Sequence, residues 1–308
     1  MKKLLALLAA GALCFSLSAC GSTQNAGSGN GLTYTYKDQK VELKAAPKRI
    51  VTLSAPLLNM AYAIGGTSVA RPETTSPIPE EAKSLPTLGH VQNINMETLV
   101  GMKPDFVLGE KNQNSKLESL LKSNHVPYVL IQYEGIEDNV PLLKFMGQIY
   151  NKQEKADNVI KTYENRIKEI EDKAAKQKPA KVAVLRATDK AVTAETPHSI
   201  CASMVEMLKM DNVITKHKDM RLDSKTVPYS LEQITADDPD IIYIVTMGKK
   251  NEINKMLDKS MRSNPAWAHL KAVQNNKVYF LEQELFLMNP GVKTPDAMEK
   301  LYSLAYEK

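Results

Sequence analysis

The longest regular pattern of apolar and polar positions runs from about Gln153 to Gln177. Its apolar residues recur at alternating steps of three and four, and they are Ile160, Tyr163, Ile167, Ile170 and Ala174. This spacing puts them on one face of a helix, with Lys, Glu, Asp and Asn on the other face. No Gly or Pro interrupts the run, and Pro179 ends it. The pattern predicts a helix about 35–40 Å long, at roughly 1.5 Å per residue.

Two similar patterns flank this helix. In the first, apolar strands are expected over 49–53 and 128–131, and Glu97 opens a short helical pattern that reaches Pro104-Asp105 and another apolar run. In the second, strands are expected over 181–185 and 277–281, Glu232 opens the helix, and Pro239-Asp240 precedes an apolar run. The Pro follows the Glu by seven residues in both halves. We therefore predict an α/β fold of two related, Rossmann-like lobes joined by one long helix.

The patterns divide the chain into five parts. The alternation of apolar and polar residues over Leu32–Leu43 predicts a short hairpin at the start of the first lobe. The expected parts are a signal segment (1–19), a Gly/Ser-rich tether (20–31), the first lobe (32–137), the inter-lobe helix (138–178) and the second lobe (179–308).

The first 20 residues are typical of an export signal. Lys2 and Lys3 precede an apolar run that is too short for a membrane span, and Leu17-Ser18-Ala19-Cys20 ends it. This ending resembles a lipobox, so we expect cleavage before Cys20 and lipidation of its thiol, with a plain secretory signal as the alternative. Acyl chains would hold the mature protein on a membrane.

Charge and cysteine usage exclude several classes of protein. The formal net charge of +5 falls to +3 once Lys2 and Lys3 are removed, and the charges are well mixed, so no nucleic-acid partner is expected. Cys201 is the cysteine left in the folded part, in an apolar helical pattern, which excludes a disulfide framework and a cysteine-based zinc site. It is expected to be a small buried residue.

The sequence shows no reactive constellation. It lacks HExxH, a nucleophile elbow, a phosphate-binding Gly loop and a dinucleotide fingerprint, so we expect no enzyme. A zinc receptor would need converging histidines, but the histidines are scattered, at positions 90, 125, 198, 217 and 269. An enzyme or a metal-ion receptor stays a remote alternative.

The loops that follow the predicted strands are the candidate ligand site, because ligands gather at the carboxyl ends of parallel strands. We expect a cleft where the loops of the two lobes face each other. The candidate residues of the first lobe are Ser54, Arg71, His90, Gln92 and Tyr133, and those of the second lobe are Arg186, Tyr229, Met247 and Phe286.

From about Ala45 to Tyr306 the layout resembles the substrate-binding proteins of ABC importers for iron complexes and vitamin B12. The resemblance rests on Pro47-Lys-Arg-Ile-Val51, on the paired Glu and Pro-Asp blocks, and on Asn276 to Phe286 with Asn289-Pro-Gly291. It implies two lobes with a ligand cleft between them and a single long connecting helix. It also implies an extracytoplasmic, lipid-anchored monomer without an intrinsic cofactor, which delivers an iron chelate to a permease dimer with its ATPase.

The same resemblance implies a docking role for Glu97 and Glu232. In that family one acidic residue on each lobe meets basic residues of the permease, and these two glutamates match by motif. We expect both to be exposed at the cleft-side ends of the lobes. The alternative is that they are ordinary glutamates that favour the local helix dipole.

The second lobe, from Asn251 to Ala297, most resembles haem-binding lipoproteins of Gram-positive iron importers. Some of these hold haem iron between a Met of the first lobe and a His of the second. Gln92 and Met247 stand at those two positions here, so the family pair is absent, but His90 lies beside Gln92. His and Met both ligate haem iron, and His90 with Met247 is therefore a possible swapped pair. The alternatives are a polar loop histidine and a core methionine.

Other ligands remain open. Some haem binders use a Tyr in the loop after the first helix, but residues 71–79 contain none. A ferric siderophore is the close competitor, since Arg71 and Arg186 offer planar donor forks that suit anionic chelates as well as haem propionates. Cobalamin comes third, with aromatic walls available at Tyr133, Tyr229 and Phe286.

Overall fold

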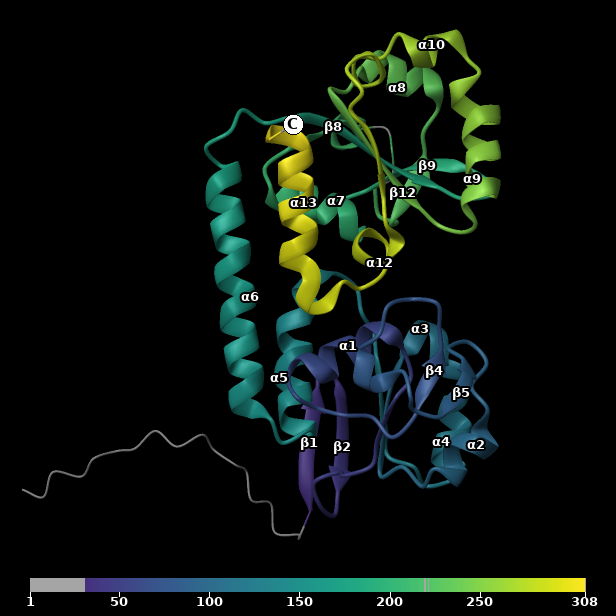
Figure 1. The fold of residues 1–308 in the computed structure, drawn as a ribbon, viewed down its shortest axis with the longest axis vertical. Helices are drawn as coiled ribbons and strands as arrows, with labels where there is room; N and C mark the ends of the chain where they lie inside the picture. The colour runs from purple at the N-terminus through teal and green to yellow at the C-terminus, as the bar shows by residue number, and fades with distance from the viewer. Residues whose placement is uncertain (1–30, 219, 221, 308) are drawn as a thin grey trace, which may run out of the picture.

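The computed structural model describes residues 31–218, 220 and 222–307, and the predicted signal segment and Cys20 lie outside this part. It has two α/β lobes, stacked one above the other in Figure 1, with helix α6 (Gln153–Ala174) running beside both of them. Among the described residues, no helix has the length and apolar character needed to cross a membrane.

The first lobe is built on a parallel sheet in the order β3-β6-β7, and β4 and β5 form a small parallel pair beside it. The expected hairpin is confirmed as β1 (Leu32–Tyr36) and β2 (Gln39–Leu43), paired antiparallel. The other strands are β3 (Ile50–Thr52), β4 (Arg71–Glu73), β5 (Thr87–His90), β6 (Phe106–Glu110) and β7 (Tyr128–Ile131).

Helices cover both faces of this sheet. Short 3₁₀ turns occupy 80–82, 115–117 and 136–138. The α-helices are α1 (Ala55–Ala63), α2 (Met96–Gly101), α3 (Lys111–Asn114), α4 (Glu118–Ser123) and α5 (Asn139–Ile149).

The second lobe has a mixed sheet in the order β11-β9-β8-β12-β13, with β10 beside β8. Strands β8, β10, β12 and β13 are parallel, whereas β9 and β11 run antiparallel to their neighbours. The strands are β8 (Lys181–Ala187), β9 (Val192–Glu195), β10 (Asp211–Asn212), β11 (Thr226–Pro228), β12 (Ile241–Thr246) and β13 (Val278–Leu281).

The helices of this lobe pack on both faces of the sheet, with 3₁₀ turns at 213–216 and 291–293 and a π-helical turn at 258–262. Cys201 is buried in α7, as expected. The helices are α7 (Ile200–Met207), α8 (Leu231–Asp237), α9 (Lys250–Leu257), α10 (Pro265–Ala268), α11 (Lys271–Gln274), α12 (Gln283–Phe286) and α13 (Thr294–Tyr306).

The apolar face of α6 contributes residues to the hydrophobic cores of both lobes. Ala156 and Ile160 belong to the core of the first lobe, and Ile170 and Ala174 belong to the core of the second. The segment expected to be one inter-lobe helix (138–178) contains two helices, because Tyr150-Asn151-Lys152 interrupts it. Helix α5 packs into the first-lobe core, so α6 is the part that connects the lobes.

Further contacts tie the lobes together beside α6. Helix α13 packs along α6, and the turn at its start reaches α1 of the first lobe (Figure 1). Gly291 has φ +55°, and a Cβ there would lie 2.7 Å from Met60 Cγ, so the two segments meet at van der Waals distance. The buried Asn139 side chain donates hydrogen bonds to the Gly291 carbonyl, the Thr294 hydroxyl and the Tyr163 hydroxyl.

These ties predict a small lobe movement. A helix that is continuous through both cores resists hinge closure, which needs a few residues free to change their backbone angles. We expect the radius of gyration from small-angle X-ray scattering to change little between the empty and the loaded protein. A large decrease on adding the ligand would contradict this expectation.

Candidate ligand-binding site

A cavity of about 380 Å³ lies between the two lobes. The first lobe contributes the start of α1 and the loop after β4, and the second lobe contributes α12 and the segment that leads into α13. Its lining includes Ala55, Pro56, Asn59, Ser76 and Pro77 from the first lobe and Glu284, Leu285, Met288, Asn289 and Lys293 from the second. The expected cleft between the lobes is therefore present, and we call it the inter-lobe groove.

Ser54 and Glu110 meet beside the first-lobe wall of the groove, although neither side chain lines the cavity. They follow the adjacent parallel strands β3 and β6, so their side chains emerge at the same sheet edge. The Ser54 hydroxyl donates to Glu110 Oε1 at 2.6 Å and, as the N-cap of α1, accepts from the Leu57 amide. Burial raises the pKa of the Glu110 carboxyl, and the hydrogen bond from Ser54 lowers it in part.

The loop that carries His90 and Gln92 is fixed to the same edge. The buried Asn114 side chain accepts from the Glu110 amide at 2.9 Å and donates to the Val91 carbonyl at 2.7 Å. Both His90 and Gln92 are exposed, and His90 Nε2 lies 3.6 Å from the Glu73 carboxylate with 74% of the histidine side chain accessible. The imidazole is therefore available to a ligand.

Met247 lies at the corresponding edge of the second lobe. It follows β12 directly, and its amide donates to the Ala187 carbonyl at the end of the neighbouring β8. The residue is 51% exposed, so a ligand can reach its thioether. The structure thus puts His90 and Met247 on the carboxyl edges of the two sheets, and neither belongs to the lining of the cavity.

Arg71 does not offer the free donor fork that the sequence suggested. Its guanidinium donates to the backbone carbonyls of Pro72 and Lys83, at 3.2 and 3.1 Å. It therefore holds the loop between β4 and β5 in place. Its Nε has no hydrogen-bond partner among the described residues, so a contact with an anionic ligand stays a prediction.

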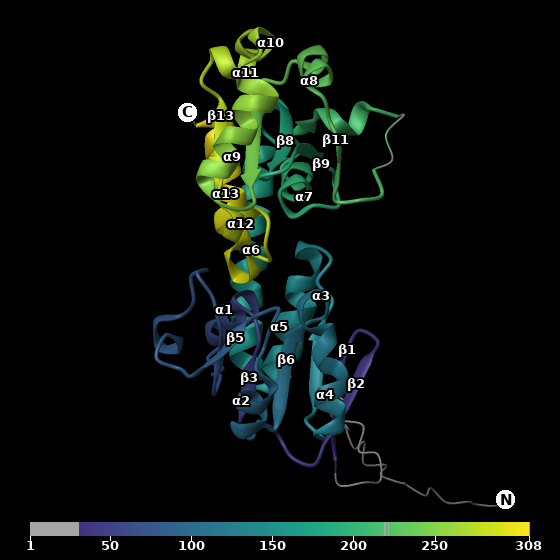
Figure 2. The same ribbon diagram turned by 90° about the vertical axis from the view of Figure 1, so that its right-hand side faces the viewer.

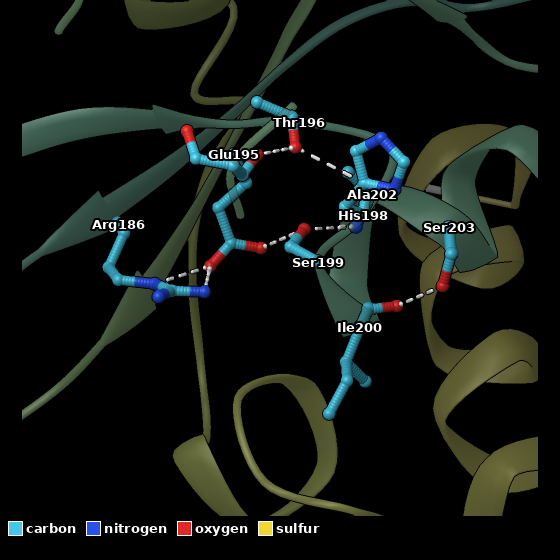
Figure 3. Close-up of polar contacts among 9 residues, drawn as sticks. Arg186, Glu195, Thr196, His198, Ser199, Ile200, Ala202 and Ser203 are labelled. Carbon is cyan, nitrogen blue, oxygen red and sulfur yellow. Dashed lines mark hydrogen bonds and ion pairs between the residues drawn. The ribbon is translucent and has the colours of Figure 1, made fainter. Parts of the chain in front are cut away.

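Arg186 is likewise engaged inside its own lobe (Figure 3). Its Nε and Nη2 both donate to Glu195 Oε1 at 2.8 Å, and the second carboxylate oxygen accepts from the Ser199 hydroxyl. Glu195 is fully buried, so the arginine compensates a charge that water cannot reach. Arg186 is thus a structural ion-pair partner.

Removing Arg186 should therefore cost stability. Arg186→Met leaves the Glu195 carboxylate buried without its cation, and we expect a loss of about 3–5 kcal/mol in the free energy of unfolding. The double variant Arg186→Met with Glu195→Leu should recover part of that loss. Lys168→Met, which breaks an exposed ion pair on α6, is the control and should cost at most about 1 kcal/mol in urea denaturation. An equally small effect of Arg186→Met would contradict the structural role.

Two of the three aromatic candidates are placed differently from the expectation. Phe286 is fully buried in the second-lobe core, and Tyr229 is buried with its hydroxyl donating to Asp237. Both are core residues and present no ring face to a ligand. Tyr133 is half-buried and packs against the cores of both lobes, and its hydroxyl has no partner among the described residues.

The sequence reasoning missed several groove residues. Met288 lines the cavity, where its sulfur accepts a hydrogen bond from Ser76 of the first lobe at 3.9 Å. Glu110 and Asn114 were missed as well. The available signal was the position of Glu110 at the end of an apolar strand, directly before a helical pattern.

Glu97 and Glu232 are both exposed in the first turns of α2 and α8. They do not lie at the cleft-side ends of the lobes. Both views show α2 at the end of the first lobe that points away from the second lobe, and α8 at the opposite end of the second lobe (Figures 1 and 2). The exposure is confirmed, and the expected location is wrong.

Groups of three or more His, Cys, Asp or Glu that could hold a metal ion do not occur among the described residues.

Comparisons with known proteins agree with this architecture. The profile of the periplasmic binding protein family matches residues 50–285. The high-affinity haem uptake system protein IsdE of Staphylococcus aureus is 28% identical over 266 residues, which cover 86% of this chain and 89% of that protein.

Solved structures have the same fold. S. aureus IsdE complexed with haem superposes with a TM-score of 0.70 at 26% identity, covering 84% of this chain and 98% of that one. An ABC transporter substrate-binding protein from Listeria monocytogenes gives 0.72 at 23% identity, with coverage of 86% and 100%. S. aureus SirA complexed with staphyloferrin B gives 0.71 at 22% identity, with coverage of 89% and 97%.

Proposed function

The chain belongs to the periplasmic binding protein family, and on that premise we propose that it is the receptor of an ABC importer for an iron complex. It captures the complex outside the cytoplasm and delivers it to a permease that works with an ATPase. The observation that carries this proposal is the 28% identity with a haem uptake protein over 86% of the chain. The family is one of binding proteins and not of enzymes, so its role is transport.

Haem is the proposed cargo, ahead of a ferric siderophore, with cobalamin less favoured. The relative that favours haem, IsdE, is similar along nearly its whole length. The likeness to SirA is a likeness of fold, and it does not choose between cargoes.

His90 and Met247 are the proposed ligands of the haem iron, one from each lobe. Their exposure at the facing sheet edges supports this assignment. A neutral imidazole and a thioether would give a six-coordinate iron held across the groove. Gln92 is exposed on the same edge of the first lobe and is a proposed contact of the porphyrin. Ser54 is buried and its hydroxyl donates to Glu110, so it is proposed to act through that residue.

The proposed anchor is a lipid on Cys20, followed by the flexible tether, and the mature protein is proposed to act as a monomer. Acyl chains on one cysteine would keep the receptor close to the permease. The mass of protein purified from membranes tests this proposal, because an uncleaved and unmodified N-terminus would contradict it.

Equilibrium titrations test the cargo. Haemin, a ferric catecholate siderophore and cyanocobalamin are each added to the purified apo-protein, and binding is followed by quenching of tyrosine and tryptophan fluorescence. We expect haemin to bind most tightly. Tight binding of the siderophore with no binding of haemin would move the proposal to siderophore import.

A further inference from the structure

The side-chain carboxyl of Glu110 has no ion-pair partner among the described residues. Among the described residues, the Ser54 hydroxyl is the hydrogen-bond partner of its side chain, and neither a hydrogen bond nor an ion pair reaches Oε2. The residue is only partly exposed, so water compensates an ionised carboxylate poorly. A neutral carboxyl suits this environment, because burial favours the protonated form.

The position of Glu110 is fixed from three sides. Strand β6 delivers it to the edge of the sheet, Ser54 holds one oxygen, and its amide is bound by Asn114. Ala55 and Pro56, which follow Ser54, line the inter-lobe groove, and Asn114 also holds the loop of His90. The carboxyl is therefore held beside residues that line the groove and beside the loop of the proposed iron ligand, and no described residue bonds to Oε2.

We propose that Glu110 binds an anionic oxygen of the cargo by donating a hydrogen bond from a neutral carboxyl, so that capture takes up a proton at any pH at which the free protein has lost it. This inference rests on the proposed function, since it assigns a contact to a carboxylate-bearing iron complex such as haem with its propionates. A protonated carboxyl donates one O–H, and a hydrogen bond to a charged acceptor is among the stronger ones. An ionised Glu110 would repel the same carboxylate.

The neighbouring charges do not change this assignment. The titratable and charged groups on the elements around Glu110 include Lys111 on α3 and Lys116 in the turn after it, Tyr128 on β7, His90 in the loop held by Asn114, and Glu73 beside that histidine. None of them contributes to the shift of the Glu110 pKa, which comes from burial and from Ser54. The shift is upward, so the neutral form persists to higher pH than in an exposed glutamate.

The sign of the pH dependence follows from linkage. The cargo carboxylate favours protonated Glu110, so binding raises the pKa of this group further and takes up a proton wherever the free protein has lost it. The affinity for an anionic cargo should therefore fall as the pH rises. One linked proton corresponds to at most about a tenfold loss per pH unit.

Calorimetry in buffers of different ionisation enthalpy measures this proton uptake directly. Haemin is titrated into the wild type, into Glu110→Gln and into the control Glu154→Gln, which removes an exposed charge at the far end of α6. We expect the wild type and the control to take up more protons per haemin than Glu110→Gln, by up to one. Their affinities should also fall more steeply with pH, by up to about tenfold per unit.

Haemin dimethyl ester, which has no free carboxylate, provides a measurement that needs no variant. With this probe the excess proton uptake of the wild type should vanish. Equal uptake by the wild type and Glu110→Gln with haemin at every pH between about 5 and 9, or the same uptake with haemin and with its ester over that range, would overturn the role of Glu110 while leaving haem capture intact. If neither protein binds haemin, the proposed cargo fails, and this inference fails with it.

Discussion

Haemin added to the apo-protein is expected to give a sharp Soret band that shifts in His90→Ala and again in Met247→Ala. Each substitution removes one axial ligand from an iron held between the two lobes, so the low-spin, six-coordinate spectrum should be lost. The affinity should fall by at least the roughly 10–100-fold that damage to the partners of a metal ligand costs. Absorption titrations measure both effects.

Matched substitutions separate ligation from packing. Met247→Leu keeps the bulk and loses the sulfur, so it should behave like Met247→Ala in the spectrum. His269→Ala removes an exposed histidine of the second lobe whose Nδ1 lies 2.9 Å from the Pro265 carbonyl, and it should leave the band unchanged. A band that is insensitive to the substitutions at 90 and 247 would keep haem as the cargo and reject this ligand pair.

Reversing the charge of both Glu97 and Glu232 to Arg is expected to abolish uptake of the iron complex. The two side chains are exposed at the outer ends of the lobes, where they are free to meet basic residues of a permease dimer. Arginines there would place like charges against each other, which costs several kcal/mol and prevents docking. Uptake of labelled haemin by cells that depend on this receptor measures the effect.

The affinity of the purified receptor for its cargo should not change in this double variant, because neither residue lies near the groove. Reversal of Glu164 and Glu169 to Arg, on the exposed face of α6, makes the same change in net charge and should leave uptake intact. Normal uptake by the Glu97 and Glu232 variant would mean that these are ordinary surface charges at helix starts.

Much of the fold could be predicted from local patterns of apolar and polar residues. The spacing of apolar residues predicted α6 to within three residues of its end, and the alternation over Leu32–Leu43 predicted the hairpin. The repeated Glu and Pro-Asp blocks predicted α2 and α8 with the strands that come after them. In the first of these blocks Asp105 accepts from the amides of Lys48 and Arg49, and it thereby fixes the start of β3.

The binding site was harder to predict from the sequence than the fold. The contacts of a polar side chain depend on residues that are distant in the sequence and that the tertiary structure brings next to it. Arg71 donates to the Lys83 carbonyl and Arg186 donates to Glu195, so both guanidinium groups make contacts inside their own lobes. The residues around either arginine in the sequence do not indicate which group it will contact. Phe286 was misassigned for a related reason, since the short helix α12 turns its ring into the core.

Because α6 packs into the cores of both lobes, it also limits which insertions and deletions the protein can tolerate in this helix. A residue inserted into a helix shifts the rest of that helix by about 1.5 Å and rotates it by about a quarter turn or more, since one turn takes 3.6 residues. Ala156 and Ile160 could stay in the first-lobe core, but Ile170 and Ala174 would then face solvent. Substitutions on the polar face of α6 should therefore be tolerated freely. Insertions and deletions should survive only in steps close to whole turns.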